Sequence, residues 1–502
     1  MSKICISLTA RTLARNLDIL EKYRKYVDVA ELRVDCLDPN ERLMIRRFPE
    51  IAGLPVILSI RRKADGGHFV SGEGSRINLM ARGLAYADLD RRKNFAYIDL
   101  EEDFNVPSIE EAARSFGTRI IRSFHGIYGD EPDLTERLRP TFDHGDDIVK
   151  ISLTAKSSWD VLGLLRLGKT YQNREKIIAA MGSYGICSRI LARQFGSAMS
   201  ITFPMKEDTE VFGHLDAKTL VELYGFRNIG PKTRIFGLAG FDIDHRHSSR
   251  FFNFLFKHEN LDAVYVPFPT DSMAACLAIA GELGVEGFSV LAPYKGLVLD
   301  SLGSQSEDVT QIGASNVITR NGGSWLAGNT EGAAFSESLL AFVRRQHLRG
   351  VRVTLLGAGA AAKAIARELF RLRAKVLVLN RTEHKAHDLA RQYRFVSGGL
   401  DSRGIGMMDR YRDIIVQATG VGEEGGGSRD PILHYRFSGQ EVLMDLLYRP
   451  EVTPLMKRAM DAGCAVLGGR DMFMRQARYE YMQFMGGDFP DHLMSKIKIG
   501  DE

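Results

Sequence analysis

Short apolar runs alternate with amphipathic, helix-length segments from Lys3 to Phe203. An apolar run of this kind predicts a buried strand, and strands that alternate with helices predict a parallel sheet. The runs are KICISL, VDVAELRVD, PVILSI, FAYIDLE, TRIIRSFH, DIVKISL, KIIAAMG and AMSITF. Eight strands in this alternation predict closure into a (β/α)8 barrel, whose active site lies at the carboxyl ends of the strands.

The pattern restarts after the segment RNIGPKTRI, in which Gly230 and Pro231 indicate a short linker. Further strand patterns follow in residues 233–336, namely RIFGLAG, AVYVPFP, GFSVLAP and ASNVITR. We therefore expect an α/β chain with a barrel in residues 1–230 and a second α/β domain in residues 231–345. Because the linker is short, the two parts should lie side by side rather than on a flexible tether.

A βαβ pattern occupies residues 351–382, VRVTLLGAGAAAKAIARELFRLRAKVLVLNRT. Gly357, Gly359 and Ala362 fill the G-x-G-x-x-G/A pattern, in which bare backbone and a helix N-terminus approach a pyrophosphate. We expect a two-lobed second half, with a Rossmann dinucleotide-binding domain in residues 346–469. The expected phosphate cradle consists of Gly357, Ala358, Gly359, Ala360, Ala361 and Ala362.

The end of the second strand in this unit distinguishes between the two nicotinamide cofactors. An NAD-binding unit usually carries Asp or Glu there, which accepts from the ribose 2′-hydroxyl. Here Asn380, Arg381 and Thr382 stand at the strand end, with Lys385 one turn later. Because the guanidinium of Arg381 can pair with a 2′-phosphate, the sequence favours NADP (NADPH) over NAD.

Composition narrows the class of protein. The 502 residues are 44% hydrophobic, and 67 basic against 63 acidic residues give a net charge of +4, so we expect no nucleic-acid partner. The five cysteines are scattered without a C-x-x-C pair, which predicts no metal site and favours a reducing cytoplasm. No apolar run is long enough to cross a membrane, and KICISLTA leaves no room for a signal peptide. We expect a cytoplasmic multidomain enzyme whose oligomeric state stays open.

Functional side chains gather at the predicted carboxyl ends of the barrel strands. They are Glu31, Arg33 and Asp35 in the second run, Arg61 after the third, Glu101 after the fourth, His125 after the fifth, Lys150 within the sixth and Met181 after the seventh. Several ionisable groups that converge on one barrel mouth predict an anionic, hydroxylated substrate.

Lys150 is the most informative of these residues, because DIVKISL places an amine inside an apolar strand. There we expect desolvation to lower its pKa and free the lone pair, as in a lysine that forms a Schiff base. His125 can move protons near neutral pH, and we expect Glu101 to orient its ring. Amine and imidazole together fit imine-assisted proton abstraction next to a ketone.

The segments ELRVD, IDLEED, SFHG and VKIS resemble type I 3-dehydroquinate dehydratase, over residues 1–225. The resemblance implies that Lys150 forms the imine, that His125 removes and returns the proton, and that Glu101 assists His125. It also implies a substrate pocket of Glu31, Arg33, Arg61, Met181 and Arg189, in which Arg189 binds the carboxylate. The family's lid motif Ser-Ala-Pro-Gly-Gln reads EVFGH here, so His214 replaces the Gln as a candidate substrate contact.

Lys295 follows the strand pattern GFSVLAPY, and Glu331 lies in GNTEG. A lysine near an acid across a nicotinamide cleft can move the proton that accompanies hydride transfer. The segments GFSVLAPYK, GASNVI, GNTEG, NRTEHKA and MFMRQA resemble shikimate dehydrogenase, over residues 233–487. The resemblance implies that Lys295 and Glu331 are catalytic and that Asn316 and Gln476 bind substrate hydroxyls. It adds Thr419 to the NADP contacts, and it implies that residues 470–495 return to complete the substrate domain.

Four positions of the second half depart from that family. Arg246 replaces the first Ser of the HSxSP stretch, whereas Ser248 keeps the second. Leu291 replaces a Thr, Glu331 an Asp and Gln417 an Asn. Arg246 still suits a substrate carboxylate, and Ser248 remains a candidate substrate contact.

Three functions remain open on the sequence. The first is a bifunctional enzyme of the shikimate pathway, which dehydrates 3-dehydroquinate to 3-dehydroshikimate and reduces this product to shikimate with NADPH. The second keeps the dehydratase but uses the other half weakly, or on another polyol acid such as quinate. The third is a dehydratase regulated by a module that binds NADP without turnover. Lys295, Asn316 and Gln476 count against the third, because a sensor does not need substrate contacts.

Overall fold

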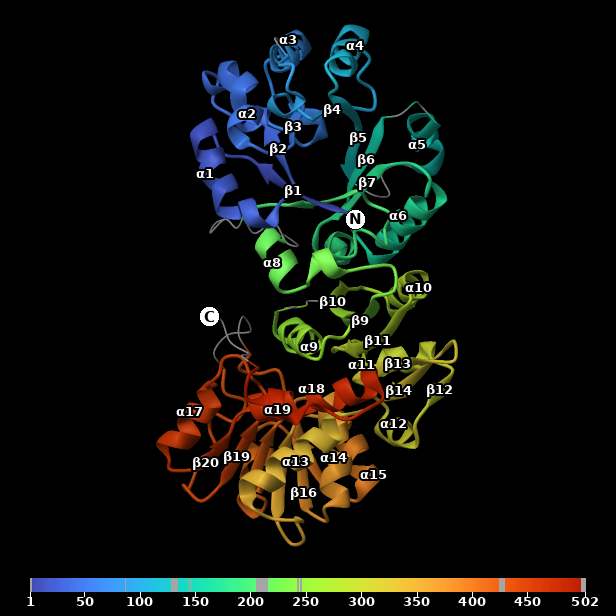
Figure 1. Ribbon diagram of the computed structural model, residues 1–502. Helices are drawn as coiled ribbons and strands as arrows, with labels where there is room; N and C mark the ends of the chain where they lie inside the picture. Colours follow the sequence, from blue (N-terminus) through green and yellow to red (C-terminus); the bar gives the residue numbers. More distant parts are fainter. Residues whose placement is uncertain are drawn as a thin grey trace. The chain divides into compact units, whose positions relative to one another are not determined.

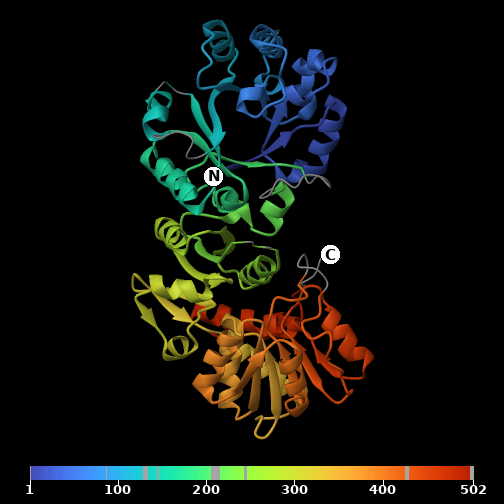
Figure 2. The ribbon, with the colours of Figure 1, turned by 180° about the vertical axis from the view of Figure 1, so that it is seen from behind.

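The protein is described from a computed structural model, which covers residues 2–85, 87–127, 134–143, 145, 147–204, 215–241, 243, 246–423 and 429–497. The chain forms two compact units that divide between Val285 and Glu286. Figures 1 and 2 follow their elements from opposite sides. Within the described residues, no helix is both long and apolar enough to span a membrane.

The first unit begins with the eight strands that the sequence predicts. They are β1 Lys3–Leu8, β2 Val29–Arg33, β3 Val56–Ser59, β4 Tyr97–Glu101, β5 Arg119–Ile127, β6 Ile148–Thr154, β7 Lys176–Met181 and β8 Met199–Thr202. They form one parallel sheet in the order β8-β1-β2-β3-β4-β5-β6-β7. The two end strands approach where Ala198 N–H donates to Lys176 O at 2.7 Å. The expected barrel is confirmed.

Helices surround these strands (Figures 1 and 2). They are α1 Leu13–Tyr23, α2 Phe48–Ala52, α3 Glu73–Leu84, α4 Pro107–Ser115, α5 Leu134–Asp143, α6 Ser158–Thr170, α7 Ile186–Ile190 and α8 Ala217–Glu222. Local sequence fixes several of their starts. Thr12 caps α1, and Ser157 with Asp160 forms a capping box at α6, so that orphan N–H groups of the first turn are satisfied.

Side chains on one face of each barrel strand change from apolar to polar along the strand. One buried cluster inside the barrel contains Cys5, Val29, Ile57, Tyr97, Ile121, Ile148, Ile177, Met199 and Ile201. Because side chains alternate with a period of two, the next residues on the same face are polar in several strands, as in Ser7, Glu31, Asp99 and Lys150. The apolar layer therefore supports a polar layer nearer the carboxyl ends.

The first unit also contains β9 Arg234–Gly240, α9 Arg246–His258, β10 Ala263–Pro269 and α10 Met273–Leu283. Asp271, just before α10, accepts from the Ser158 N–H at 2.9 Å and from its hydroxyl at 2.6 Å, at the start of α6. Glu282 at the other end of α10 pairs with Lys169 at 2.8 Å. These contacts attach residues beyond the predicted linker to the barrel, so the compact units divide later than Gly230.

The second unit starts with a mixed sheet region that includes β11 Val285–Val290, β12 Ser304–Gln305, β13 Val317–Asn321 and β14 Ser324–Gly328. Strand β13 pairs antiparallel with both β11 and β14. The helices of this part are α11 Tyr294–Leu297, α12 Glu307–Ile312 and α13 Glu331–Val343.

A doubly wound sheet completes the second unit, with all its strand pairs parallel in the order β17-β16-β15-β18-β19-β20. Its strands are β15 Arg352–Leu356, β16 Lys375–Asn380, β17 Val396–Gly399, β18 Ile414–Gln417, β19 Val442–Asp445 and β20 Ala465–Leu467. Its helices are α14 Ala360–Arg371, α15 Glu383–Tyr393, α16 Ser402–Met407, α17 Pro454–Asp461, α18 Gly469–Met485 and α19 Asp491–Met494. The strand order reverses between β15 and β18, which is the usual place for a dinucleotide. The expected Rossmann fold is confirmed.

Candidate active sites

Lys150 lies in β6 with a side chain that is 3% exposed, between two carboxylates from other strands. Its Nζ is 2.6 Å from Asp99 Oδ2 and 3.0 Å from Glu31 Oε1. Ser7 donates to the other oxygen of Glu31 at 2.7 Å. The amine is therefore held at one position by acceptors from β2 and β4, as a nucleophile requires.

The sequence-based expectation for the pKa of Lys150 is wrong. Burial alone lowers this pKa, but the charges of Asp99 and Glu31 outweigh burial and raise it above its ordinary value. The resting amine is thus an ammonium, and a proton must leave before it can attack a ketone. Asp99 is the nearer of the two carboxylates to the Nζ.

His125 lies on β5, and its buried Nε2 has no hydrogen-bond partner among the residues that the structure describes. Burial, and then the positive charges of Arg61 and Lys150, lower its pKa well below the ordinary value. The imidazole is therefore neutral at pH 7, with a ring nitrogen that can accept a proton.

This pKa gives a pH prediction. An exposed histidine would lose its base form as the pH falls through about 6.5. For His125 the lowered pKa keeps the base form present below that pH, so we expect kcat/KM for dehydration to stay level from pH 7.5 to 6.5 and to fall only in more acidic solution. Initial rates measured across pH, with fluorescence to check folding, test this. A midpoint at 6.5 would show that the imidazole titrates like an exposed one.

Glu101 does not contact His125 among the described residues, contrary to expectation. Arg76, which is fully buried, donates to Glu101 at 2.6 Å, and Arg62 lies 3.8 Å away. Burial raises the pKa of Glu101 even so. The two arginines hold this carboxylate, and the predicted assistance to His125 has no hydrogen bond to support it.

The other predicted residues of the barrel supply positive charge. Arg33 forms a bidentate pair with Asp35 at 2.9 and 2.8 Å, and Arg61 lies 3.6 Å from Glu31. Arg189 on α7 is 2% exposed, and its Nε and Nη2 have no hydrogen-bond partner in the described part of the chain. Burial lowers its pKa to about 10. An unpaired buried guanidinium is costly unless an anion binds it, which fits a substrate carboxylate.

Of four further predicted substrate contacts, the structure describes the side chains of two. Met181 ends β7 and is half-buried. His214 lies outside the described residues, as does the Arg246 side chain at the start of α9. Ser248 is half-buried in α9, which belongs to the first compact unit, whereas Lys295 belongs to the second.

Lys295 of α11 and Glu331 at the start of α13 form an ion pair of 2.6 Å between Nζ and Oε1. Their side chains are 14% and 4% exposed. The other carboxylate oxygen of Glu331, Oε2, is buried and accepts no hydrogen bond from any described residue. The longer side chain of Glu331 therefore reaches Lys295 directly and leaves one acceptor for a donor group of a ligand.

Asn316 and Gln476 meet at a third residue, Glu480 of α18. The Asn316 Nδ2 and the Gln476 Nε2 each donate to Glu480 Oε1 at 2.8 Å. Asn316 is 1% exposed, and it also exchanges hydrogen bonds with Thr330, next to Glu331. The structure thus brings both predicted hydroxyl contacts together beside the Lys295–Glu331 pair.

The glycine turn after β15 leaves open backbone at the start of α14. Gly357 has φ +114°, and a Cβ there would lie 2.8 Å from Ala418 O, so only glycine fits. A Cβ on Gly359 would meet nothing within 4 Å. An open backbone at the N-terminus of a twelve-residue helix fits a dinucleotide pyrophosphate.

The strand ends beside this turn carry the predicted adenosine-side contacts. Asn380 donates to Thr382 O at 2.9 Å. Arg381, just before α15, and Lys385, in its first turn, are both exposed. On β18, the buried Gln417 accepts from both the N–H and the hydroxyl of Thr419, at 3.1 and 3.0 Å. Gln417 thus organises the loop in which Thr419 lies.

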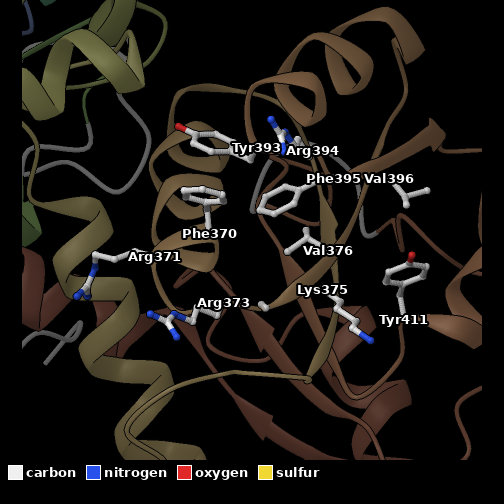
Figure 3. Close-up of a pocket in the computed structure, with 11 residues that line it drawn as sticks. Phe370, Arg371, Arg373, Lys375, Val376, Tyr393, Arg394, Phe395, Val396 and Tyr411 are labelled. Carbon is white, nitrogen blue, oxygen red and sulfur yellow. The ribbon is translucent and has the colours of Figure 1, made fainter.

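A separate cavity of about 560 Å³ lies at the first residues of β16 and β17, the strand ends remote from the glycine turn. Figure 3 shows Phe370, Phe395 and Val376 at its centre. The charged ends of Arg373 and Lys375 point in different directions (Figure 3), so they do not converge on one anion.

Asp99 and Glu480 contact predicted site residues, and the sequence did not identify them. Asp99 shares the inward face of β4 with Glu101, two residues earlier, so strand alternation could have indicated it. Glu480 follows Gln476 by four residues on one helix face, which is the corresponding signal in α18.

Comparison with known proteins accounts for both sites. The family model for type I 3-dehydroquinase matches residues 4–231, that for the shikimate dehydrogenase substrate binding domain matches 238–318, and that for shikimate / quinate 5-dehydrogenase matches 340–424. The chloroplastic bifunctional 3-dehydroquinate dehydratase/shikimate dehydrogenase of Arabidopsis thaliana is 27% identical, over 99% of this chain and 84% of its own. The NADP(+) shikimate dehydrogenase of Pyrococcus abyssi is 32% identical, over 53% of this chain and 97% of its own. That of Shouchella clausii is 31% identical, over 51% of this chain and 94% of its own.

The chain therefore belongs to the bifunctional family that joins a type I 3-dehydroquinate dehydratase to a shikimate dehydrogenase.

Proposed function

We propose that this chain catalyses two consecutive steps of the shikimate pathway. The barrel removes water from 3-dehydroquinate to give 3-dehydroshikimate, and the second half reduces that product to shikimate with NADPH. The observation that carries the first step is Lys150, buried at hydrogen-bond distance from Asp99 and Glu31. The 2.6 Å pair of Lys295 and Glu331 supports the second.

The barrel mechanism begins with proton transfer from the Lys150 ammonium, for which Asp99 is the nearest acceptor. The free amine attacks the substrate ketone, water leaves, and an imine forms. The neutral imidazole of His125 then takes the C2 proton and gives it to the departing C1 hydroxyl. Hydrolysis of the product imine restores Lys150, so that the net change is the loss of one water. Arg189 binds the substrate carboxylate throughout.

In the second half, residues 357–362 would hold the pyrophosphate of the cofactor, and Arg381 with Lys385 its 2′-phosphate. NADPH, when bound, supplies the hydride for the ketone carbon. Lys295 is placed to give a proton to the ketone oxygen, and Glu331 holds the lysine in position. The free Oε2 of Glu331 can accept from a substrate hydroxyl.

Separate assays of the two steps test this assignment. Formation of the conjugated enone from 3-dehydroquinate reports dehydration, and NADPH loss with added 3-dehydroshikimate reports reduction. We expect both activities in one purified chain. A protein that binds NADPH without oxidising it would support the regulatory alternative, and faster NADP reduction with quinate than with shikimate would support the alternative substrate.

We expect a preference for NADPH over NADH that depends on Arg381. A charge-assisted pair with a phosphate contributes about 1.5 to 3 kcal/mol, or roughly ten- to a hundred-fold in affinity. Arg381→Ala should remove most of the preference and leave kcat/KM for NADH almost unchanged. Arg391→Ala, which removes an exposed arginine from the last turn of α15, the helix that follows Arg381, is the matched control. Equal kcat/KM for both cofactors in the parent enzyme would contradict the assignment.

The five cysteines are all unpaired, and four of them are buried. We place the enzyme in a reducing compartment, the cytoplasm, on this basis. Microscopy of a tagged chain in its own cell tests the placement.

A further inference from the structure

Glu480 is a buried carboxylate that contacts both predicted hydroxyl-binding residues of the dehydrogenase half, and the mechanism above does not use it. Its side chain lies in α18, and the residue is 3% exposed. Its Oε1 accepts from Asn316 Nδ2 and from Gln476 Nε2, each at 2.8 Å, and its Oε2 accepts from the hydroxyl of Ser289 on β11. The carboxylate thus joins three side chains that come from three different segments.

These bonds fix which end of Asn316 is the oxygen. The backbone N–H of Thr330 can only donate, and it lies 2.7 Å from Asn316 Oδ1. Both hydrogens of Asn316 Nδ2 are then used, one toward Thr330 Oγ1 at 2.7 Å and one toward Glu480. Asn316 has no donor left, and only one lone pair of Oδ1 remains for a ligand.

The other two partners of Glu480 are restricted in the same way. Ser289 has a single hydroxyl hydrogen, which it gives to Glu480, so that this hydroxyl cannot donate to a ligand. Gln476 uses one N–H on Glu480 and is half-buried, which leaves its carbonyl and its second N–H for a ligand. An ionised carboxylate has no donor of its own.

We propose that Glu480 is a positioning residue that sets the hydrogen-bond polarity of the dehydrogenase pocket. It engages the donors of Ser289 and Asn316, so that Asn316 can only accept from a ligand, which selects substrates whose hydroxyl groups donate. This deepens the proposed function and rests on it, since Asn316 and Gln476 are taken as the contacts of the hydroxylated substrate. The free Oε2 of Glu331 adds a further acceptor in the same pocket.

The ionisation of Glu480 gives this role a pH signature. Burial raises the pKa of Glu480 to about 7. The hydrogen bonds from Gln476, Ser289 and Asn316 and the charge of Lys295 act in the opposite direction, but burial outweighs them. Among the described residues, Lys295 is the charged group that acts on Glu480, and Lys295 itself pairs with Glu331. Below that pH the Glu480 carboxylate is protonated and gains an O–H. One of the three side chains that donate to it then loses its acceptor, so the hydrogen-bond directions of these side chains are no longer fixed. The KM for the hydroxylated substrate should therefore rise as the pH falls through about 7.

Steady-state kinetics of the full chain with 3-dehydroshikimate and NADPH test the proposal. Glu480→Gln keeps the size of the side chain but adds an N–H2 that faces existing donors. We expect KM for 3-dehydroshikimate to rise roughly ten- to a hundred-fold. KM for NADPH should stay within about two-fold, and the pH dependence of the substrate KM near 7 should disappear. Glu441→Gln is the control, because Glu441 is a 2% exposed carboxylate with hydrogen bonds to Ser438 and Tyr435, outside this pocket.

If Glu480→Gln has the same substrate KM and the same pH profile as the parent enzyme, the proposal is overturned. A lower melting temperature would not change this conclusion, because it reports only stability. If Glu480→Gln does not fold, Ser289→Ala decides, because it removes one donor and keeps the carboxylate. A several-fold rise in substrate KM in Ser289→Ala then supports the proposal, and an unchanged KM overturns it. If the parent enzyme does not oxidise NADPH when 3-dehydroshikimate is present, the proposed function itself is wrong. The role proposed for Glu480 is then wrong as well, because it rests on that function.

Discussion

Replacing Lys150 with alanine is expected to abolish dehydration of 3-dehydroquinate and to leave reduction of added 3-dehydroshikimate near the parent rate. Removal of a covalent nucleophile typically costs on the order of 10³- to 10⁶-fold in kcat. Reduction should survive because Lys295 and Glu331 belong to the other compact unit. Enone formation and NADPH loss, measured on the same preparation, give the two rates.

Lys150→Arg separates charge from covalent chemistry. It keeps a cation for Asp99 and Glu31 but cannot form the imine, so we expect it to fold like the parent enzyme and to be as inactive as Lys150→Ala. Substantial dehydration by Lys150→Arg would show that only the charge is needed.

Borohydride reduction in the presence of 3-dehydroquinate identifies the nucleophile directly. The barrel has a second buried lysine, Lys176, whose pKa is lowered by burial and whose Nζ donates to Tyr171 O at 2.8 Å. Lys176 is the first residue of β7, whereas the predicted mouth lies at the carboxyl ends. We expect the adduct on Lys150 alone. An adduct on Lys176, or none, would remove the Schiff-base assignment.

Glu331→Gln is expected to lower kcat for 3-dehydroshikimate reduction by on the order of a hundred-fold, because an amide cannot hold the Lys295 ammonium as an ion pair. Glu331→Asp should not exceed the parent rate. Because aspartate is shorter by one carbon–carbon bond, its carboxylate would lie about 1.5 Å further from Lys295. The 2.6 Å contact between Lys295 Nζ and the carboxylate would then be lost.

The matched control for both variants lies one turn and a half along the same helix. Glu337 of α13 pairs with Arg475 and accepts from Tyr479 at 2.9 Å, away from Lys295. Glu337→Gln should leave kcat within about two-fold of the parent value. A Glu331→Gln enzyme as fast as the parent would show that this carboxylate has no catalytic role, and the regulatory alternative would gain.

Sequence reasoning predicted the strands well, because their apolar runs are short and regular. It also placed Lys150 inside β6 and Gly357 in the glycine turn that follows β15. It failed where the environment of a residue comes from another segment. The pKa of Lys150 depends on Asp99, which lies 51 residues earlier in the chain, and burial alone gave the wrong direction.

The point at which the two compact units divide could not be predicted, because it depends on contacts between segments that are far apart in the sequence. Gly230 and Pro231 indicate a linker in the sequence, yet Asp271 and Glu282 attach the next segment to α6 of the barrel. Glu480 was missed because a polar residue on a helix normally faces solvent, and only Ser289 and Asn316 from other elements show that it is buried.

One coupled assay tests the central claim most directly. The purified chain is given 3-dehydroquinate and NADPH, and NADPH loss and shikimate formation are followed together. We expect one NADPH oxidised for each shikimate formed, and no reaction with Lys150→Ala unless 3-dehydroshikimate is added. Accumulation of 3-dehydroshikimate with NADPH left intact would contradict the account.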